Sequence, residues 1–314
     1  MGSQPEPPPG DSGCDVLNVS ALDPGARDEQ LKRELSRLSI GLLAINGLIG
    51  AGIFGLPSEA AKLVGPYSPV VFLVCGLLMS TVMVAFAQLA SYFSGTGGPI
   101  LYTQTAFGRF VGFQTGWLIY VGRVTSIGAN VNLLATYLAS FIPGADHGWW
   151  RIGVVFVVIA IFTVLNVVGV KQGMSTVAVL TFFKLIPLVV FIVVGLAYVR
   201  AEPFAPTVFP GVGSFGEAVL LVFYAFIGFE GAVIPAGETR DPQRNIPRAL
   251  IAVAAITTVL YLLIQIVSVG VLPDLASSTR PLADVAAISL GAFGFCLMSV
   301  GAIVSILGNT AASL

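Results

Sequence analysis

Long apolar segments recur along this chain, and they constrain its fold more than any other feature. A helix needs about 20 mostly apolar residues to cross the roughly 30 Å of hydrocarbon in a bilayer. By that measure the sequence contains about eight such segments. They cover residues 38–64, 69–93, 110–141, 149–168, 175–199, 215–236, 249–272 and 286–314. We therefore expect an all-α polytopic membrane protein with about eight transmembrane helices.

The composition supports a membrane protein and excludes several other classes. The 314 residues are 56% hydrophobic and 10% charged, whereas a soluble domain carries about 25% charged residues. The formal net charge is −1, so no basic surface is available to neutralise nucleic-acid phosphates. Cys14, Cys75 and Cys296 lie far apart and predict no disulfide framework and no metal site. No nucleophile with a nearby base lies in any segment, so we expect neither an enzyme nor a cofactor.

Residues 1–37 differ from the rest of the chain. They are polar, rich in proline and acidic residues, and contain no apolar signal region, so we expect a disordered tail. Residues 38–314 then form the transmembrane domain, which we expect to be incomplete because the last apolar segment runs into Leu314. Most Lys and Arg residues of the loops lie on the side of the N-terminus, and this bias predicts a cytoplasmic N-terminus in the cell membrane.

Two glycines interrupt the middle of the first apolar segment. The run reads Ile49, Gly50, Ala51, Gly52 and Ile53, and each glycine costs a helix about 1 kcal/mol relative to alanine. In hydrocarbon every backbone N–H and C=O must be paired, so a broken helix persists only where it is buried in protein or lines a cavity. The amides that begin the helix after such a break carry the positive end of its dipole, which suits a carboxylate.

A second interruption lies five apolar segments later. Its residues are Tyr224, Phe226, Ile227, Gly228 and Phe229. The carbonyls before this break suit an ammonium group, so together the two breaks fit a zwitterion such as an α-amino acid. An odd number of segments per repeat inverts the second copy, and paired broken helices in two inverted halves mark the binding site of many transporters. The alternative is that these glycines only allow helices to pack closely.

Three ionisable residues fall inside apolar segments, where a charge costs at least roughly 2.5 to 3.5 kcal/mol on insertion scales. Lys184 has no carboxylate nearby in its own segment, so it must find one elsewhere, lose its proton, face water or snorkel to the interface. Glu230 lies in the second break and could take up a proton, pair with a cation or accept the N–H groups of the unwound backbone. Arg123 is a candidate ion-pair partner for Glu230. All three are candidate coupling or gating residues.

Polar and aromatic side chains near the breaks have simpler interpretations. Asn130 and Asn132 lie in the same segment and are candidates for hydrogen bonds between helices. Tyr224, Phe226 and Phe229 flank the second break, where they could cover a bound solute as a gate. The side chains named around the breaks are mostly apolar, which favours a substrate with a neutral side chain.

Several motifs in the same order resemble the amino acid-polyamine-organocation (APC) superfamily of permeases, which have the leucine-transporter fold of two five-helix inverted repeats. The motifs are Gly50-Ala51-Gly52-Ile53-Phe54 with Leu56-Pro57, Ala87-Gln88-Leu89-Ala90-Ser91 with Thr96-Gly97-Gly98-Pro99, Asn166-Val167-Val168-Gly169-Val170-Lys171, Phe226-Ile227-Gly228-Phe229-Glu230, and Glu238-Thr239-Arg240-Asp241-Pro242 with Gln243-Arg244-Asn245-Ile246-Pro247.

The resemblance implies a secondary transporter that moves amino acids by alternating access. It implies that backbone at Gly50, Ala51 and Gly52 binds the substrate carboxylate and that the turn from Tyr224 to Gly228 binds the amino group. A lysine at the position of Lys184 replaces sodium in sodium-independent members, which implies proton-coupled transport or exchange. The alternative function is a membrane sensor that binds amino acids at the same site without moving them. The partners expected are an amino acid, protons and the lipid bilayer.

Overall fold

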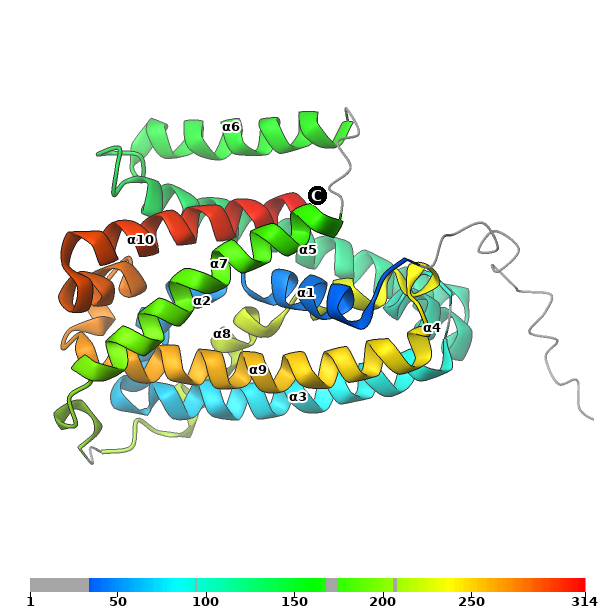
Figure 1. Ribbon diagram of the computed structural model, residues 1–314, viewed down its shortest axis with the longest axis horizontal. Helices are drawn as coiled ribbons and strands as arrows, with labels where there is room; N and C mark the ends of the chain where they lie inside the picture. Colours follow the sequence, from blue (N-terminus) through cyan, green and yellow to red (C-terminus); the bar gives the residue numbers. More distant parts are fainter. Residues whose placement is uncertain (1–33, 94, 168–173, 206–207, 314) are drawn as a thin grey trace, which may run out of the picture.

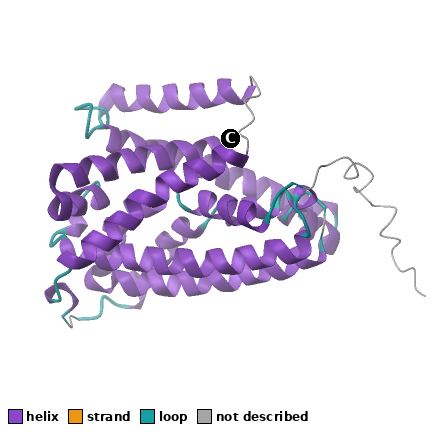
Figure 2. Ribbon diagram, in the orientation of Figure 1, coloured by secondary structure: helices purple, strands orange, loops and turns teal. Residues whose placement is uncertain are grey.

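The computed structural model describes residues 34–93, 95–167, 174–205 and 208–313. Helices make up nearly all of this part of the chain (Figures 1 and 2), and its β structure is limited to one bridge between Leu35 and Thr239. The third motif above, at residues 166–171, lies partly outside the described residues, as does most of the predicted N-terminal tail. The all-α prediction is confirmed for the described part.

The first apolar segment forms two helices instead of one. Helix α1 (Arg37–Leu48) begins after Ser36, whose Oγ accepts a hydrogen bond from the Ser39 amide at 3.2 Å, as is usual for a serine N-cap. Helix α2 (Gly52–Val64) follows after a three-residue break. A 3₁₀ turn, η3 (Gly65–Tyr67), then leads into α3 (Ser68–Tyr92).

The next three helices are α4 (Pro99–Phe107), α5 (Arg109–Leu138) and α6 (Gly148–Val167). Gly108 joins α4 to α5 with a φ of +87°, a conformation that residues with a Cβ rarely adopt. Trp149 and Trp150 are 85% and 74% exposed at the start of α6. Exposed tryptophans at a helix end are typical of the membrane–water interface.

The second half of the described chain contains the second broken helix. Helix α7 (Met174–Gly195) is followed by short 3₁₀ turns and by α8, which ends at the second break. After this break the chain continues in 3₁₀ turns. The elements between α7 and α9 are η4 (Leu196–Tyr198), η5 (Glu202–Phe204), α8 (Val212–Phe223), η6 (Tyr224–Phe226), η7 (Phe229–Val233) and η8 (Ala236–Glu238).

Two long helices complete the described chain. Helix α9 (Pro242–Val271) is followed by the 3₁₀ turn η9 (Leu275–Ser277) and by α10 (Pro281–Ser313). Helix α10 contains a kink at Gly291, where φ is +65°. Thr279, in the loop before α10, lines a cavity together with residues of α2.

The core forms around the broken helices. Helices α3 and α9 lie side by side along one edge, and α1 and α2 lie in the middle of the bundle (Figure 1). Helix α6 lies at the opposite edge, against α5. Ile40, Ile49, Ile53 and Phe54 from the first broken segment are fully or almost fully buried. The first break is therefore enclosed by protein, as the unpaired backbone of a broken membrane helix requires.

The helices correspond to all eight predicted segments. Five stretches are long and apolar enough to cross a membrane, and the first of them joins α2 to α3. Helix α1 and residues Gly148–Val164 form shorter apolar helices, and the 30-residue α5 occupies the remaining segment. The five stretches are Gly52–Tyr92, Thr181–Tyr198, Val212–Val233, Pro242–Val271 and Pro281–Thr310.

Candidate functional site

The first predicted break is present at the position that the glycines indicated. Helix α1 ends at Leu48 and α2 begins at Gly52. Between them Ile49 leaves the helical region with φ −81° and ψ 83°. The peptide groups on both sides of the break therefore lack the partners that an uninterrupted helix would give them.

Side chains from three other helices satisfy the carbonyl groups at the end of α1. Lys184 of α7 donates to Asn46 O at 3.1 Å and to Ile49 O at 2.8 Å. Tyr261 of α9 donates to Leu48 O at 2.9 Å. Two residues of α10 complete the set: Ser305 donates to Ile49 O at 3.1 Å, and Asn309 donates to Gly47 O at 2.8 Å and to Asn46 O at 3.3 Å.

The amides on the other side of this break have no side-chain partner among the residues that the structure describes. The residue before α2 is Ala51, which provides no side-chain cap for the first turn. The first N–H groups of any helix have no partner inside the helix and carry the positive end of its dipole. Ala51 and Gly52 also line a small cavity. This end of the break can therefore accept an anionic group.

The second break has a different construction. The 3₁₀ turn η6 ends at Phe226, Ile227 adopts an extended conformation, and Gly228 has a φ of +119°. A φ in this range strongly favours glycine. The Gly228 amide donates to Oε2 of Glu230 at 2.8 Å, so a side chain of the same segment satisfies the unwound backbone. This is one of the three roles predicted for Glu230.

The two breaks are in direct contact through glycines. A Cβ built on Gly47 would collide with Gly228 O, and a Cβ built on Gly228 would collide with Gly47 O. On the other side of the first break, a Cβ on Gly52 would lie 2.8 Å from the Cα of Ala225. These glycines therefore allow the close packing that was the alternative interpretation, and they do so at the same place where the helices unwind.

A large cavity of about 910 Å³ lies beside both breaks. It lies on the α1 side of the first break, because residues of α1 line it and residues of α2 do not. Its wall combines apolar residues with polar and charged ones. The wall includes Leu43, Asn46 and Gly47 of α1, Gly122, Arg123 and Ser126 of α5, Tyr224, Ile227, Gly228 and Glu230 around the second break, and Asn309 of α10.

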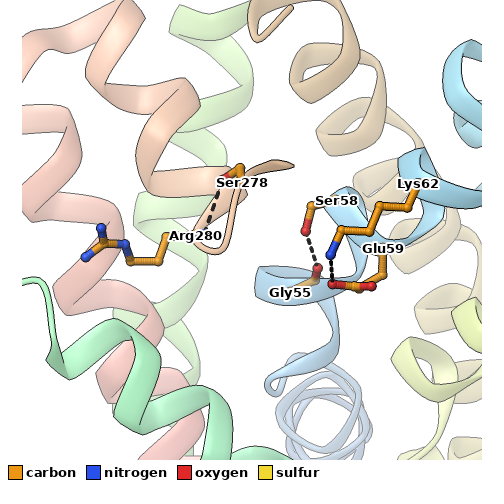
Figure 3. A network of polar contacts seen from close by, with 6 residues as sticks. All are labelled: Gly55, Ser58, Glu59, Lys62, Ser278 and Arg280. Atoms are coloured by element: carbon orange, nitrogen blue, oxygen red, sulfur yellow. Dashed lines mark hydrogen bonds and ion pairs between the residues drawn. The ribbon is translucent and has the colours of Figure 1, made fainter. Parts of the chain in front are cut away.

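A smaller cavity of about 180 Å³ lies on the other side of the breaks. Its wall includes Gly55, Ser58 and Glu59 of α2 and Thr279 of the loop that leads into α10. Figure 3 shows Ser58 bonded to Gly55 and Glu59 paired with Lys62 on α2, across from Ser278 and Arg280 in that loop. Tyr224 lines both cavities and therefore lies between them.

The structure places the predicted substrate-binding residues in two groups. Those that line one of the two cavities are Ala51, Gly52, Tyr224, Ile227 and Gly228. Those whose side chains are buried in the core are Ile49, Ile53, Phe226 and Phe229. Gly50 is packed against Asn309, whose side-chain amide would lie 2.9 Å from a Cβ at that position.

The cavity wall contains many apolar residues, as expected, but only Ile227 of the four named around the pocket lies in it. Ile49 and Ile53 turn into the core, Phe226 stacks edge-on against Tyr261 at 5.0 Å between ring centroids, and Phe229 packs against Phe86 at 5.2 Å. Each of these large side chains is stabilised more by burial than by facing a wet cavity. The apolar part of the cavity wall comes instead from residues such as Leu43, Leu118 and Ile234.

The three charged candidates have distinct surroundings. Lys184 is only 1% exposed and has no carboxylate partner among the described residues, so it does not snorkel to the interface. Arg123 and Glu230 both line the large cavity. The predicted ion pair between them is not formed, because the ion pairs of the described residues are Lys62 with Glu59 and His147 with Asp146.

A chain of hydrogen bonds joins the two breaks through α5 and α10. The Tyr224 hydroxyl donates to Oδ1 of Asn130 at 3.0 Å, and Nδ2 of Asn130 donates to Oδ1 of Asn309 at 3.0 Å. Asn309 in turn donates to the carbonyls at the end of α1. The predicted role of Asn130 between helices is confirmed. Asn132 also bonds another helix, accepting at Oδ1 from Nε of Arg151 at 3.0 Å.

The sequence interpretation missed several polar residues of the site. Their common feature is a single polar residue within a long apolar segment, which is expensive in a membrane unless it has a partner. In the sequence, only the charged residues and Asn130 and Asn132 were interpreted as such isolated polar residues. The missed residues are Asn46, Ser126, Tyr261, Ser305 and Asn309.

Comparison with known proteins identifies the family. The model of the family described as amino acid permease matches residues 35–314. The chain belongs to the amino acid permease family. This permease is 28% identical to the branched-chain amino acid permease BcaP of Bacillus subtilis, with 78% of the chain covering 56% of that protein. It is also 28% identical to the methylthioribose transporter of the same organism, with 81% of the chain covering 59% of that relative.

A third relative is an uncharacterised transporter of Mycobacterium tuberculosis, 30% identical, with 89% of the permease covering 64% of it. The permease thus spans somewhat more than half the length of these relatives. The resemblance to APC superfamily permeases is confirmed, and the chain is an integral membrane protein. The relatives carry the names of permeases and transporters, which confirms that the family is not one of enzymes.

Proposed function

We propose that this permease is a sodium-independent secondary transporter of amino acids that works by alternating access. The observation that carries this proposal is the ammonium of Lys184, which bonds two carbonyls at the end of α1. These carbonyls would otherwise be free to coordinate a cation such as sodium. With the fixed ammonium in their place, transport uses a proton gradient or exchange of one amino acid for another.

The broken helices support an amino acid as the substrate. The uncapped first turn of α2 offers amides to a carboxylate, and the turn at Ile227 and Gly228 lies at the cavity wall, where its backbone can accept from an ammonium group. The name of one relative, a branched-chain amino acid permease, agrees with this class of substrate.

The two cavities support alternating access. The large cavity of about 910 Å³ lies on the α1 side of the first break, and the cavity on the α2 side has only about 180 Å³. Tyr224 lies between them. With the N-terminus in the cytoplasm, as the distribution of Lys and Arg predicts, this conformation faces inward in the cell membrane.

Uptake by proteoliposomes tests the proposal. The full-length protein is reconstituted, and the uptake of labelled amino acids is measured with and without sodium, with and without a pH gradient, and with amino acid loaded inside. We expect uptake that needs no sodium and that responds to the pH gradient or to internal amino acid. Lys184→Met should abolish this uptake, whereas the matched variant Lys62→Met, at an exposed lysine of α2, should retain it.

Two results would contradict the proposal. Sodium-dependent uptake that survives Lys184→Met would remove the claim about coupling. Saturable binding of amino acids in detergent without uptake or counterflow in vesicles would instead indicate the alternative function, a membrane sensor that uses the same site without transport.

A further inference from the structure

The side-chain oxygen of Asn46 has no hydrogen-bond partner among the described residues, although it is buried. Asn46 lies on α1 at the wall of the large cavity and is only 3% exposed. Its main-chain carbonyl accepts from both Lys184 and Asn309, yet its side-chain oxygen Oδ1 is buried without a hydrogen bond to any described residue. Buried side-chain polar atoms are nearly always bonded. An unpartnered amide beside a cavity therefore indicates a group that a ligand satisfies.

Other neutral polar groups surround the same part of the cavity. Ser126 and Tyr224 contribute hydroxyl groups, and Asn309 contributes an amide. An asparagine amide presents both a donor and an acceptor, and a hydroxyl does the same. The Tyr224 hydroxyl and the Asn309 amide already donate to other groups of the protein, so this set offers acceptor lone pairs, which suit the O–H or N–H of a ligand hydroxyl or amide.

The charges of the wall balance one another. The two charged side chains that line the large cavity are Arg123 and Glu230, of opposite sign. A ligand part that enters this space therefore meets no net charge from the described residues. A neutral polar group fits the wall better than an anionic or a cationic one.

The position of Asn46 along α1 matches the length of an amino acid. It precedes the break at Ile49 by three residues, and three residues of an α-helix rise about 4.5 Å. A substrate whose carboxylate and ammonium lie at the breaks would direct its side chain over about this distance. Asn46 would therefore contact the end of the side chain, while the backbone of the breaks contacts the charged groups.

We propose that Asn46 is a specificity-determining residue that hydrogen-bonds the side chain of the substrate, so that this permease prefers amino acids with uncharged hydroxyl or amide side chains. The inference rests on the proposed function, because it assigns the side-chain part of the same site. It differs from a preference for branched aliphatic side chains, which would leave the Asn46 amide unpaired.

Matched pairs of amino acids test this preference in the full-length protein. Threonine and valine have nearly the same shape and differ in one hydroxyl, and asparagine and leucine differ in the same way by an amide. Binding is measured by calorimetry in detergent. We expect threonine to bind more tightly than valine, and asparagine more tightly than leucine, by roughly three- to tenfold, the range that one neutral hydrogen bond supplies.

Asn46→Leu removes the amide at nearly constant size and should bring both affinity ratios close to one. Asn132→Leu is the matched control, because Asn132 lies on α5 outside both cavities and bonds Arg151 and the backbone; it should leave both ratios unchanged. If Asn46→Leu does not yield folded protein, Asn46→Ser shortens the polar group and should lower the asparagine-to-leucine ratio more than the threonine-to-valine ratio.

The outcomes separate this inference from the proposed function. Equal or tighter binding of valine and leucine by the unaltered protein overturns the inference and leaves amino-acid transport intact. If Asn46→Leu lowers the affinity for all four amino acids equally, the inference is also overturned, because that result would mean that Asn46 binds the ammonium group common to all of them. Binding of none of the four, with the protein folded, contradicts the proposed function itself.

Discussion

The two broken helices satisfy their unpaired backbone groups in different ways. At the first break, donors from α7, α9 and α10 hold the end of α1, and they include Lys184, Tyr261 and Asn309. At the second break, the nearest partner comes from the same segment, where Glu230 accepts the amide of Gly228. After the first break the chain continues as the 13-residue helix α2, whereas after the second it continues in short 3₁₀ turns.

The difference indicates which break is fixed and which can move. An arrangement held by several helices changes only if those helices move together, whereas an arrangement held by a local side chain can change with few other contacts. The second break also lines the large cavity, and the Ile227 side chain there is 52% exposed. We therefore expect the first break to act as the fixed part of the site and the second as the part that rearranges.

The largest effect is expected where the two breaks touch. Gly228→Ala places a Cβ against Gly47 O and forces alanine to a φ of +119°. The backbone strain alone costs roughly 1 to 3 kcal/mol. The collision with Gly47 O adds to this cost. Gly291→Ala is the matched control, since Gly291 also has a positive φ but open space around it. The midpoint of heat-induced unfolding in detergent should fall much further for Gly228→Ala. Equal shifts would mean that the contact between the breaks is unimportant.

The next largest effect should come from the anchor of the first break. Lys184→Met removes two charge-assisted hydrogen bonds, although Asn309 and Ser305 still donate to the same two carbonyls and the buried charge is removed as well. We expect a net loss of about 2 kcal/mol in the free energy of unfolding. Lys62→Met, which breaks only an exposed pair with Glu59, should change it by less than about 1 kcal/mol. If Lys184→Met left the free energy of unfolding unchanged, Lys184 would not stabilise the first break.

A smaller loss of stability is expected at the second break. Glu230→Gln keeps the size of the side chain but replaces the charge-assisted bond from Gly228 N–H by a neutral one, at a cost of about 1 kcal/mol. Because this bond belongs to the part that rearranges, the rate of uptake should change more than the unfolding midpoint does. Glu59→Gln, at an exposed carboxylate of α2, should leave both nearly unchanged. A midpoint shift larger than that of Lys184→Met would reverse the proposed roles of the two breaks.

The smallest effect is expected for the hydrogen bond between the breaks. Tyr224→Phe removes the hydroxyl that donates to Asn130 but keeps the ring between the two cavities, so the unfolding free energy should fall by at most about 1 kcal/mol. Tyr92→Phe, at a residue that is 80% exposed on α3, should cause no shift. The difference between their midpoints of thermal unfolding measures how much the hydrogen bond to α5 stabilises the second break.

Local sequence determined the eight apolar segments and the places where two of them break. Length and apolarity set the eight segments because hydrocarbon admits few other structures, and glycine runs such as Gly50-Ala51-Gly52 mark where a helix can unwind. The close approach of Gly47 and Gly228 was not predicted, since it depends on how distant segments meet. The same holds for the donor set of Lys184, Tyr261 and Asn309.

Only the tertiary structure decided which side chains face the cavity. Ile49, Ile53 and Phe229 lie beside the breaks in sequence yet turn into the core, whereas Asn46 and Asn309, from helices far apart in the chain, meet at the cavity wall. The physical reason is that helical periodicity shows which residues share a face of a helix, but not which face meets a neighbouring helix and which meets a cavity. The direction of a side chain is set by how the helices pack together, which buries Ile49, Ile53 and Phe229 in the core and brings Asn46 and Asn309 to the cavity.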